Sequence, residues 1–210
     1  MPKRPLKRRL REPSITREKL LQAGFIEMHL NGFQAASLDT ILARAEMTKG
    51  ALYHHFPDKA ALGLAVVDEV VRGFLLERWL GPLEESGGDP LAAIQRALQQ
   101  RADSVSAEEV ELGCPLNNLA QEMSPLDERF RRRINATLDA WTDGLAAVLE
   151  RGQKGGSVRP DVDPRRIASF IVSSVEGSYG MAKGAKSTRL FRSNLGVLIG
   201  FLETLRVRSA

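Results

Sequence analysis

The stretch from Ser37 to Phe56, SLDTILARAEMTKGALYHHF, constrains the fold of this chain more than any other. Ser37 is a favourable residue to cap a helix. The apolar residues that follow it recur at spacings of three and four: Leu38, Ile41, Leu42 and Ala45. Thr48 can cap a second helix, in which Leu52 and Phe56 lie one turn apart and face inward. The stretch therefore predicts two short helices joined by a tight turn, the layout of a helix-turn-helix.

The outward side of the second helix is suited to a nucleic-acid groove. It combines small residues with hydrogen-bond donors: Lys49, Gly50, Ala51, Tyr53 and His54. Small side chains let a helix approach a groove closely, and donors can reach base edges and phosphates.

The segment TKGALYHHFPDKAAL follows a predicted helix of about fifteen residues and the segment SLDTILARA. Together these three parts resemble the DNA-binding domain of the TetR family of repressors. The resemblance runs from about Thr16 to Phe74. One departure lies in the turn, where the family usually has glycine and this chain has Glu46. A non-glycine residue must then take the turn conformation at a modest strain cost, and its carboxylate would weaken non-specific binding to phosphates.

The resemblance and the order of residues on the second helix imply roles in DNA binding. The residues expected to hold phosphates are Ser37, Thr48, Tyr53, His54 and Lys59. Those expected to approach base edges are Lys49, Gly50 and Ala51. Arg17 completes the predicted DNA-binding set.

Charge is distributed unevenly along the chain. Residues 1–59 hold eleven Lys and Arg against six acids, a net charge of +5, whereas the whole chain of 210 residues carries +4. A basic segment joined to a neutral one is typical of a DNA reader with a separate sensing domain. We therefore predict a basic arm over 1–13, a DNA-binding domain over 14–74 with its helix-turn-helix motif at 37–56, and a ligand-sensing and dimerisation domain over 75–210. The arm is either a solubilising tail or a DNA-contacting segment.

The composition of the chain argues against several classes of protein. No run approaches the roughly eighteen apolar residues of a membrane span, and no apolar segment follows the basic N-terminus as in an export signal. The single cysteine, Cys114, excludes an internal disulfide and fits a reducing cytoplasm. Cysteine and histidine do not cluster as zinc ligands do, so we expect no metal and no cofactor.

Proline, glycine and capping residues divide the chain into helices, and no strand pattern is present. The expected fold is all-α with about nine helices: Thr16 to Asn31, the two of the motif, Asp58 to about Leu80, one opening at Asp89-Pro90, a short one opening at Cys114-Pro115, Ser124 to about Gly152, Pro164 to about Lys183, and Ser187 to about Arg206. The helix from Asp58 should end at Gly81-Pro82. Its expected inward stripe consists of Leu62, Val66, Val70 and Phe74.

The last two helices are the predicted dimer interface. The final helix is apolar over more than one face, which indicates burial on more than one side. The resemblance implies that both helices pair with their copies in a four-helix bundle, and the alternative is that they close the core of one chain. The predicted interface residues are Gly177, Gly180, Leu195, Leu198, Phe201 and Leu202.

Two segments, GCPLNNLAQEM at 113–123 and EGSYGMAK at 176–183, resemble a TetR subgroup that responds to small electrophiles and unsaturated acids. The chain departs from that pattern at Pro115 and Asn117, so the ligand is not carried over. Cys114 falls at a helix start, where free N–H groups and the helix dipole should lower its pKa, and Lys183 is a conceivable cationic neighbour. The alternative is an inert packing cysteine.

The other candidate ligand residues mix aromatic surface with a few polar groups, as small-molecule sites do. The predicted sensor set is Cys114, Asn117, Gln121, Trp141, Glu176, Tyr179 and Lys183. Trp141, like Phe170, fits a place in the hydrophobic core better than a ligand contact.

These observations predict a dimeric regulator, a repressor that leaves a palindromic DNA operator when a small molecule or electrophile acts on its C-terminal domain. Two other classes of protein are alternatives to a regulator. A helical enzyme is disfavoured because the chain lacks the common catalytic motifs. A sequence-neutral DNA-packaging protein would explain the basic arm but not a long neutral domain.

Overall fold

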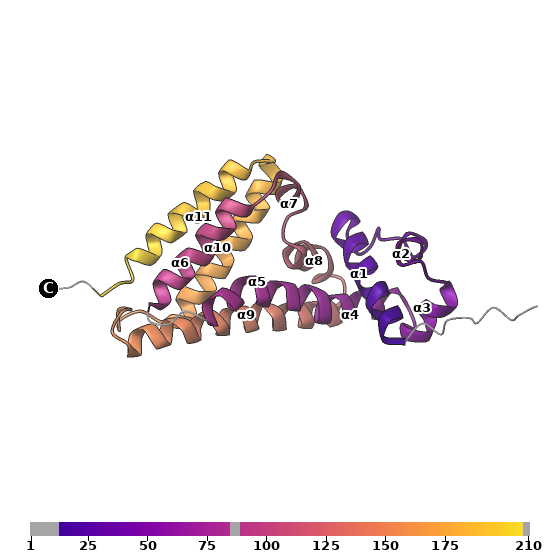
Figure 1. Ribbon diagram of the computed structural model, residues 1–210, viewed down its shortest axis with the longest axis horizontal. Coiled ribbons are helices and arrows are strands. Elements are labelled where there is room, and N and C mark those ends of the chain that lie inside the picture. Colours follow the sequence, from indigo (N-terminus) through magenta and orange to yellow (C-terminus); the bar gives the residue numbers. More distant parts are fainter. Residues whose placement is uncertain (1–12, 85–88, 208–210) are drawn as a thin grey trace, which may run out of the picture. The chain divides into compact units, whose positions relative to one another are not determined.

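The computed structural model describes residues 13–84 and 89–207, and within these ranges the regular elements are helical (Figure 1). In chain order they are α1 (Pro13–Asn31), α2 (Leu38–Ala45), α3 (Lys49–His55), α4 (Lys59–Ala65), the π-helical segment η1 (Val66–Val71), α5 (Arg72–Glu84), α6 (Pro90–Ser104), α7 (Ala107–Leu112), α8 (Pro115–Met123), α9 (Glu128–Lys154), α10 (Pro164–Ala185) and α11 (Thr188–Glu203). An isolated bridge joins Val158 and Arg206. None of the described helices is long and apolar enough to cross a membrane.

The all-α class is confirmed, and each of the nine predicted helices is present once α4, η1 and α5 are taken together as the helix expected from Asp58. The helix that the sequence reading missed is α7. Its signal was a capping box, in which Ser106 Oγ accepts from Glu109 N at 3.1 Å and Ser106 N donates to Glu109 Oε2 at 3.0 Å. The predicted arm over 1–13 lies outside the described residues except for Pro13, which opens α1.

The stripe predicted for the helix from Asp58 is wrong in its second half. Leu62 and Val66 are buried as expected, but Val70 is only partly buried and Phe74 is exposed. Val67 is buried beside Val66, and the later buried residues are each one position beyond a regular continuation of the stripe: Val71, Leu75, Trp79 and Leu83. The cause is η1, because a π-helical turn contains one residue more than an α-helical turn and so rotates the inward face.

The same helix also passes its predicted end. Pro82 lies inside α5 rather than after it, and Leu83 follows in the core with 2% of its surface exposed. Proline removes one backbone N–H from a helix. Burial of Leu83 and Trp79 keeps the last turn helical in spite of that loss.

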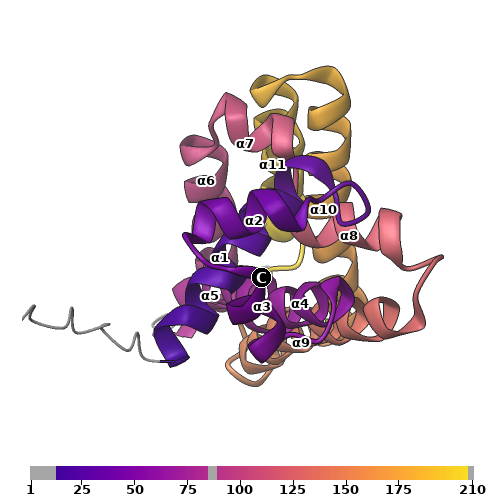
Figure 2. The ribbon, with the colours of Figure 1, turned by 90° about the vertical axis from the view of Figure 1, so that its right-hand side faces the viewer.

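The chain divides into two compact units, one up to Val66 and one from Val67 onward. The division therefore falls eight residues earlier than the predicted boundary after Phe74. In the first unit α1 packs against α2, α3 and α4, and Figure 2 shows α2 and α3 at the front of this cluster. Its innermost side chains are Leu20, Ile41, Leu52 and Leu62.

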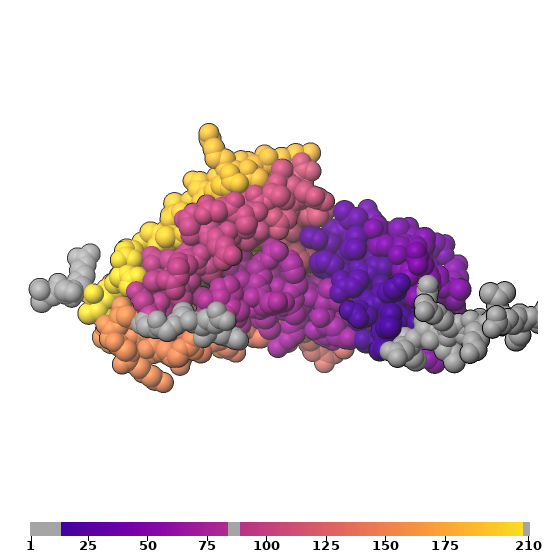
Figure 3. Space-filling view, viewed as in Figure 1, coloured from indigo at the N-terminus to yellow at the C-terminus, as the bar shows by residue number. Residues whose placement is uncertain are grey.

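The second unit is a helical bundle. α9 packs against α5, α6, α8 and α10, while α11 packs against α6 and α10. Figure 3 shows α6 and α11 in continuous contact along one face. At the centre Trp79 stacks on Trp141 with ring centroids 5.2 Å apart. Gly144 allows α5 and α9 to approach closely, because a side chain at this position would collide with Leu80.

Candidate functional site: a recognition helix and a cavity in the helical bundle

The helix-turn-helix forms as the sequence predicts. Ser37 Oγ accepts from Thr40 N at 3.3 Å, and Thr48 Oγ1 accepts from Ala51 N at 3.2 Å. The turn residue Glu46 has φ 56° and ψ 43°, the left-handed conformation that glycine adopts most easily. The expectation that a non-glycine takes this conformation is therefore confirmed.

The outward face of α3 is accessible. Lys49, Gly50 and His54 are exposed and Tyr53 has 52% of its surface exposed, whereas Leu52 is buried in the core. A Cβ added at Gly50 would meet only Thr48 Oγ1, at 3.9 Å. Packing within the protein thus does not require glycine here, and the bare backbone is left free for a close approach from outside.

Lys49 forms an ion pair that sequence reasoning did not foresee. Its Nζ lies 3.0 Å from Asp39 Oδ1, and both side chains are largely exposed. The hydrogen bond to Asp39 raises the pKa of Lys49. The pair links the start of α2 to the start of α3 across the turn and holds the ammonium group at the outer face.

Two other predicted DNA contacts have packing partners in the first unit. Lys59 Nζ donates to the carbonyl oxygen of Gln34 at 2.9 Å and lies 5.1 Å from the centroid of the Phe33 ring. The Arg17 guanidinium lies 5.3 Å from the centroid of the Phe56 ring. These contacts orient both cations without burying them.

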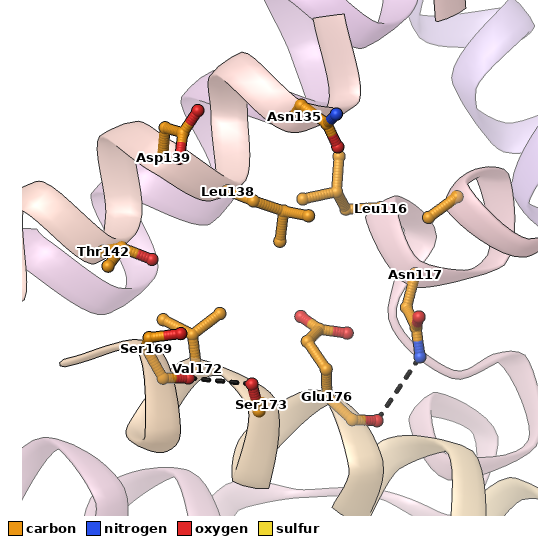
Figure 4. A pocket seen from close by; sticks show the side chains of 11 residues that line it. Leu116, Asn117, Asn135, Leu138, Asp139, Thr142, Ser169, Val172, Ser173 and Glu176 are labelled. Carbon is orange, nitrogen blue, oxygen red and sulfur yellow. Dashed lines mark hydrogen bonds between the residues drawn. The ribbon is translucent and has the colours of Figure 1, made fainter. Parts of the chain in front are cut away.

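The second unit contains a cavity of about 390 Å³ between α8, α9 and α10 (Figure 4). Its apolar lining consists of Leu116, Ala120, Leu138 and Val172. Its polar lining consists of Asn117, Asn135, Asp139, Thr142, Ser169, Ser173 and Glu176. Asn117 Nδ2 donates to the backbone oxygen of Glu176 at 3.4 Å, which ties the start of α8 to α10.

Glu176 is the buried acid of this cavity. Only 8% of its surface is exposed, and its carboxyl group points into the cavity in Figure 4. Oε1 accepts a hydrogen bond from the Cys114 thiol at 3.2 Å, whereas Oε2 is buried without a hydrogen-bond partner. Burial raises the pKa of Glu176 to about 7, although the thiol bond acts in the opposite direction.

The prediction of a lowered pKa for Cys114 is wrong. Cys114 is the N-cap of α8, and the backbone N–H groups of Leu116 and Asn117 do lower its pKa as expected. Burial, with 3% of the residue exposed, and the negative charge of Glu176 outweigh them and raise the pKa well above its ordinary value. Lys183 Nζ donates instead to Leu112 O at 3.1 Å and to Asn118 Oδ1 at 3.2 Å.

The structure brings together only part of the predicted sensor set. Asn117 and Glu176 line the cavity, and Cys114 adjoins it through Glu176. Gln121 and Lys183 are exposed and do not line the cavity. The predicted core place of Trp141 is confirmed, since it stacks on Trp79 with 1% of its surface exposed.

Tyr179 belongs to a separate buried cluster that sequence reasoning missed. Arg101 Nε donates to Tyr179 Oη at 2.7 Å, and Arg101 Nη2 lies 3.0 Å from Glu109 Oε1. Because Arg101, Glu109 and Tyr179 come from three different helices, no local spacing could have revealed this cluster.

Three of the residues predicted at the dimer interface lie inside the single chain instead. Leu195, Leu198 and Leu202 are buried within the core of the single chain, because they face α6 and α10 and leave nothing for a partner to cover. Gly177 and Gly180 are exposed, and Phe201 is partly exposed with its ring 5.1 Å from that of Phe170. Phe170, expected in the core, has 49% of its surface exposed.

Comparison with known proteins gives consistent matches. The family model for "Bacterial regulatory proteins, tetR family" matches residues 20–66, and that for "Tetracyclin repressor-like, C-terminal domain" matches residues 90–195. The transcriptional regulator AcuR of Cereibacter sphaeroides is 28% identical over 187 residues, covering 87% of this chain and 84% of AcuR. The repressor DhaR of a Mycobacterium species is 27% identical, covering 77% of this chain and 79% of DhaR. The crystal structure of reduced NemR from Escherichia coli superimposes with a TM-score of 0.79 at 25% identity, covering 93% of this chain and 99% of NemR.

Proposed function

The chain belongs to the TetR family of bacterial transcriptional regulators, and we propose that it is a dimeric repressor that leaves a palindromic operator when a small molecule enters the cavity beside Glu176. One observation carries the ligand-responsive part of this proposal. This observation is that Glu176, one of whose carboxyl oxygens is buried without a hydrogen-bond partner, lines a cavity large enough for a small molecule.

The DNA-binding part is supported by the exposed face of α3. Lys49, Gly50 and Ala51 stand at the start of this helix, where a recognition helix meets base edges. Ser37, Thr48, Tyr53, His54 and Lys59 are proposed to hold phosphates, and Arg17 to add to the positive field.

Dimerisation is proposed through the outer face of α10 and α11. Gly177, Gly180, Gly196 and Gly200 have nothing within 4 Å of an added Cβ, so packing inside the chain does not require them to be small. Large apolar side chains are exposed on the same two helices: Phe170, Met181 and Val197. Small residues and exposed apolar groups together favour a helix-to-helix contact with a second copy. Two recognition helices held by a dimer fit a palindromic site.

A reversible ligand fits the cavity better than a thiol switch. A thiolate is the reactive form of cysteine, and the raised pKa of Cys114 keeps the thiol protonated. The ligand need only bind more tightly to the conformation that cannot engage the operator.

Footprinting on the DNA that flanks the gene tests the regulatory proposal. A regulator protects a discrete palindrome, and the protection should be lost on adding the effector. Uniform protection without a boundary would favour the DNA-packaging alternative instead, and turnover of a small molecule would favour the enzyme alternative.

The thiol alternative has its own test. Operator release by an electrophile or a peroxide should be slow, and equal in the wild type and in Cys114→Ser, because the thiol is buried and protonated. Fast release in the wild type that Cys114→Ser abolishes would restore the thiol switch.

A further inference from the structure

We infer that the cavity between α8, α9 and α10 selects a small ligand with a protonated primary or secondary amine, whose N–H groups donate to Oε2 of Glu176. This inference rests on the proposed function, since it names the chemical class of the effector.

The two oxygens of Glu176 are differently engaged. Oε1 accepts the hydrogen bond of the Cys114 thiol, which leaves Oε2 as an acceptor with no donor inside the protein. A buried carboxylate oxygen without a donor is costly, so few are retained without a purpose. The Glu176 carboxyl group is directed toward the open centre of the cavity in Figure 4.

The charge of the lining selects against anions. Among the described residues, the cavity is lined by no lysine, arginine or histidine, whereas two carboxyl groups reach it, Glu176 from α10 and Asp139 from α9. Asp139 is partly neutralised, since its Oδ1 lies 3.6 Å from Arg165 Nη2 and both side chains are largely exposed. A carboxylate or phosphate ligand would therefore meet like charge and no compensating cation.

The lining also distinguishes among cations. Quaternary ammonium groups have no N–H and are usually held by aromatic rings, and the lining that the structure describes contains no aromatic side chain. It offers hydrogen-bond acceptors instead, which suit an amine that keeps its N–H groups. Leu116, Leu138 and Val172 provide apolar surface for the hydrocarbon part of the ligand.

Amine binding should be coupled to a proton on Glu176. With a pKa of about 7, about half of the Glu176 carboxyl groups are protonated at pH 7, and an ammonium ion that binds the carboxylate displaces that proton. The other titratable groups around Glu176 are the Cys114 thiol, which donates to it from the start of α8, and Asp139 on α9, which lines the same cavity, while Tyr179 and Lys183 follow on α10. Cys114 stays protonated in this range, so release of about half a proton at pH 7 reports on Glu176.

The test is calorimetric titration of the full-length protein with three probes of one shape: cyclohexylamine, cyclohexanol and cyclohexanecarboxylate. The amine should bind about tenfold or more tightly than the alcohol, because a hydrogen bond to a charged group is worth more than one between neutral groups. The carboxylate should bind least. Repeating the amine titration at pH 7 in buffers with different ionisation enthalpies counts the released protons.

Two matched variants test whether Glu176 is responsible for amine binding and for proton release. Glu176→Gln should weaken amine binding about ten- to hundredfold and abolish proton release, and it should weaken binding of the uncharged alcohol less. Glu150→Gln makes the same chemical change at an exposed position of α9 and should alter neither. The melting temperature of each variant shows that it is folded.

The inference is overturned if the carboxylate binds more tightly than the amine, if none of the probes binds, or if Glu176→Gln binds the amine as the wild type does. Operator binding is measured separately without any probe. Operator binding together with failure of the amine to bind would reject only the inference, whereas amine binding by a protein with no operator would reject only the proposed repressor function.

Discussion

The outer face of α3 and the cavity beside Glu176 differ in how their residues are brought together. The α3 face is made from residues close together in sequence between Thr48 and His54, of which Lys49, Gly50, Tyr53 and His54 are exposed. The cavity draws on α8, α9 and α10, and its key contact joins Cys114 to Glu176 across 62 positions of sequence. The comparison teaches that a DNA-reading surface can be local in sequence, while the sensing site exists only after the bundle has formed.

The two regions also differ in energetic character. Exposed pairs such as Lys49 with Asp39 contribute little to folding because water screens them. Glu176, by contrast, is a buried acid with an unpaired oxygen. Removing its carboxyl group from water lowers the free energy of unfolding. Substitutions on the α3 face should therefore change DNA binding more than stability, and substitutions inside the second unit should change stability first.

The sharpest contrast between surface and core lies at two neighbouring residues of α11. Leu198 is 4% exposed and Val197 is 72% exposed. Leu198→Glu should lower the free energy of unfolding by roughly 3 to 5 kcal/mol, because it buries an unpaired charge inside the chain. Val197→Glu should leave the monomer folded and raise the dimer dissociation constant about a hundredfold, which corresponds to about 3 kcal/mol.

Sedimentation and thermal unfolding separate these two results. Leu126→Glu is a suitable control, because it adds the same charge at an exposed apolar residue outside the proposed interface. An intact dimer for Val197→Glu would move the interface away from the outer face of α10 and α11.

Glu176 predicts an unusual dependence of stability on pH. Its pKa rises from an ordinary value of 4.5 to about 7 in the folded protein. The folded state therefore binds the proton more tightly than the unfolded state does. The contribution of this proton to the free energy of unfolding is fully present below pH 4.5 and is lost as the pH rises to about 7. The loss amounts to about 3 kcal/mol.

Urea unfolding of the wild type and of Glu176→Gln at pH 5 and pH 8 measures the effect. The difference between the two proteins should change with pH by most of that amount, and subtraction removes the contributions of the other acids. A difference that stays constant with pH would mean that water reaches the carboxyl group.

Two lysines of the first unit test the division between base and phosphate contacts. Lys49→Ala should cost about 1 to 3 kcal/mol at particular base pairs and relax the preference there. Lys59→Ala should weaken binding to all sequences alike and reduce the salt slope by about one. Competition binding with operator variants at several salt concentrations measures both.

Lys59 also holds the carbonyl of Gln34, so its variant needs a stability control. If Lys59→Ala lowered the melting temperature and left the salt slope intact, its role would be structural rather than phosphate binding.

The smallest expected effect on folding lies at Gly50. An alanine there has room within the protein and should raise the free energy of unfolding by up to about 1 kcal/mol, since alanine favours helix more than glycine does. Operator affinity should nevertheless fall, because the added methyl group stands where the groove approaches α3. A protein that is more stable and binds the operator equally well would remove Gly50 from the interface.

Local patterns predicted much of the first unit and less of the second. Ser37, Thr48 and Glu46 could be placed because caps and turns depend on a few adjacent residues. Of the predicted sensor residues, only Asn117 and Glu176 line the cavity. The predicted direction of the shift in the Cys114 pKa was wrong. Burial and a partner 62 positions away decide that pKa, and neither can be seen from the helix start alone.

Three residues of the predicted interface were placed on the wrong side of α11 for a related reason. An apolar helix such as α11 indicates that it is covered, but its sequence does not say whether its own chain or a second copy covers each side. Leu195, Leu198 and Leu202 proved to face inward, and the small residues Gly196 and Gly200 stand on the opposite side.

The π-helical segment between Val66 and Val71 has a consequence for the lengths of related chains. One extra residue in a single turn is what an insertion leaves behind when the contacts on both of its sides are kept. A relative that lacks one residue in this segment could form a regular α-helix, with Val66 and Val71 brought to ordinary spacing and the same side chains still inward. Alignments of this helix should therefore place a one-residue gap within the π-helical turn, where the chain can absorb a change in length without exchanging its buried residues.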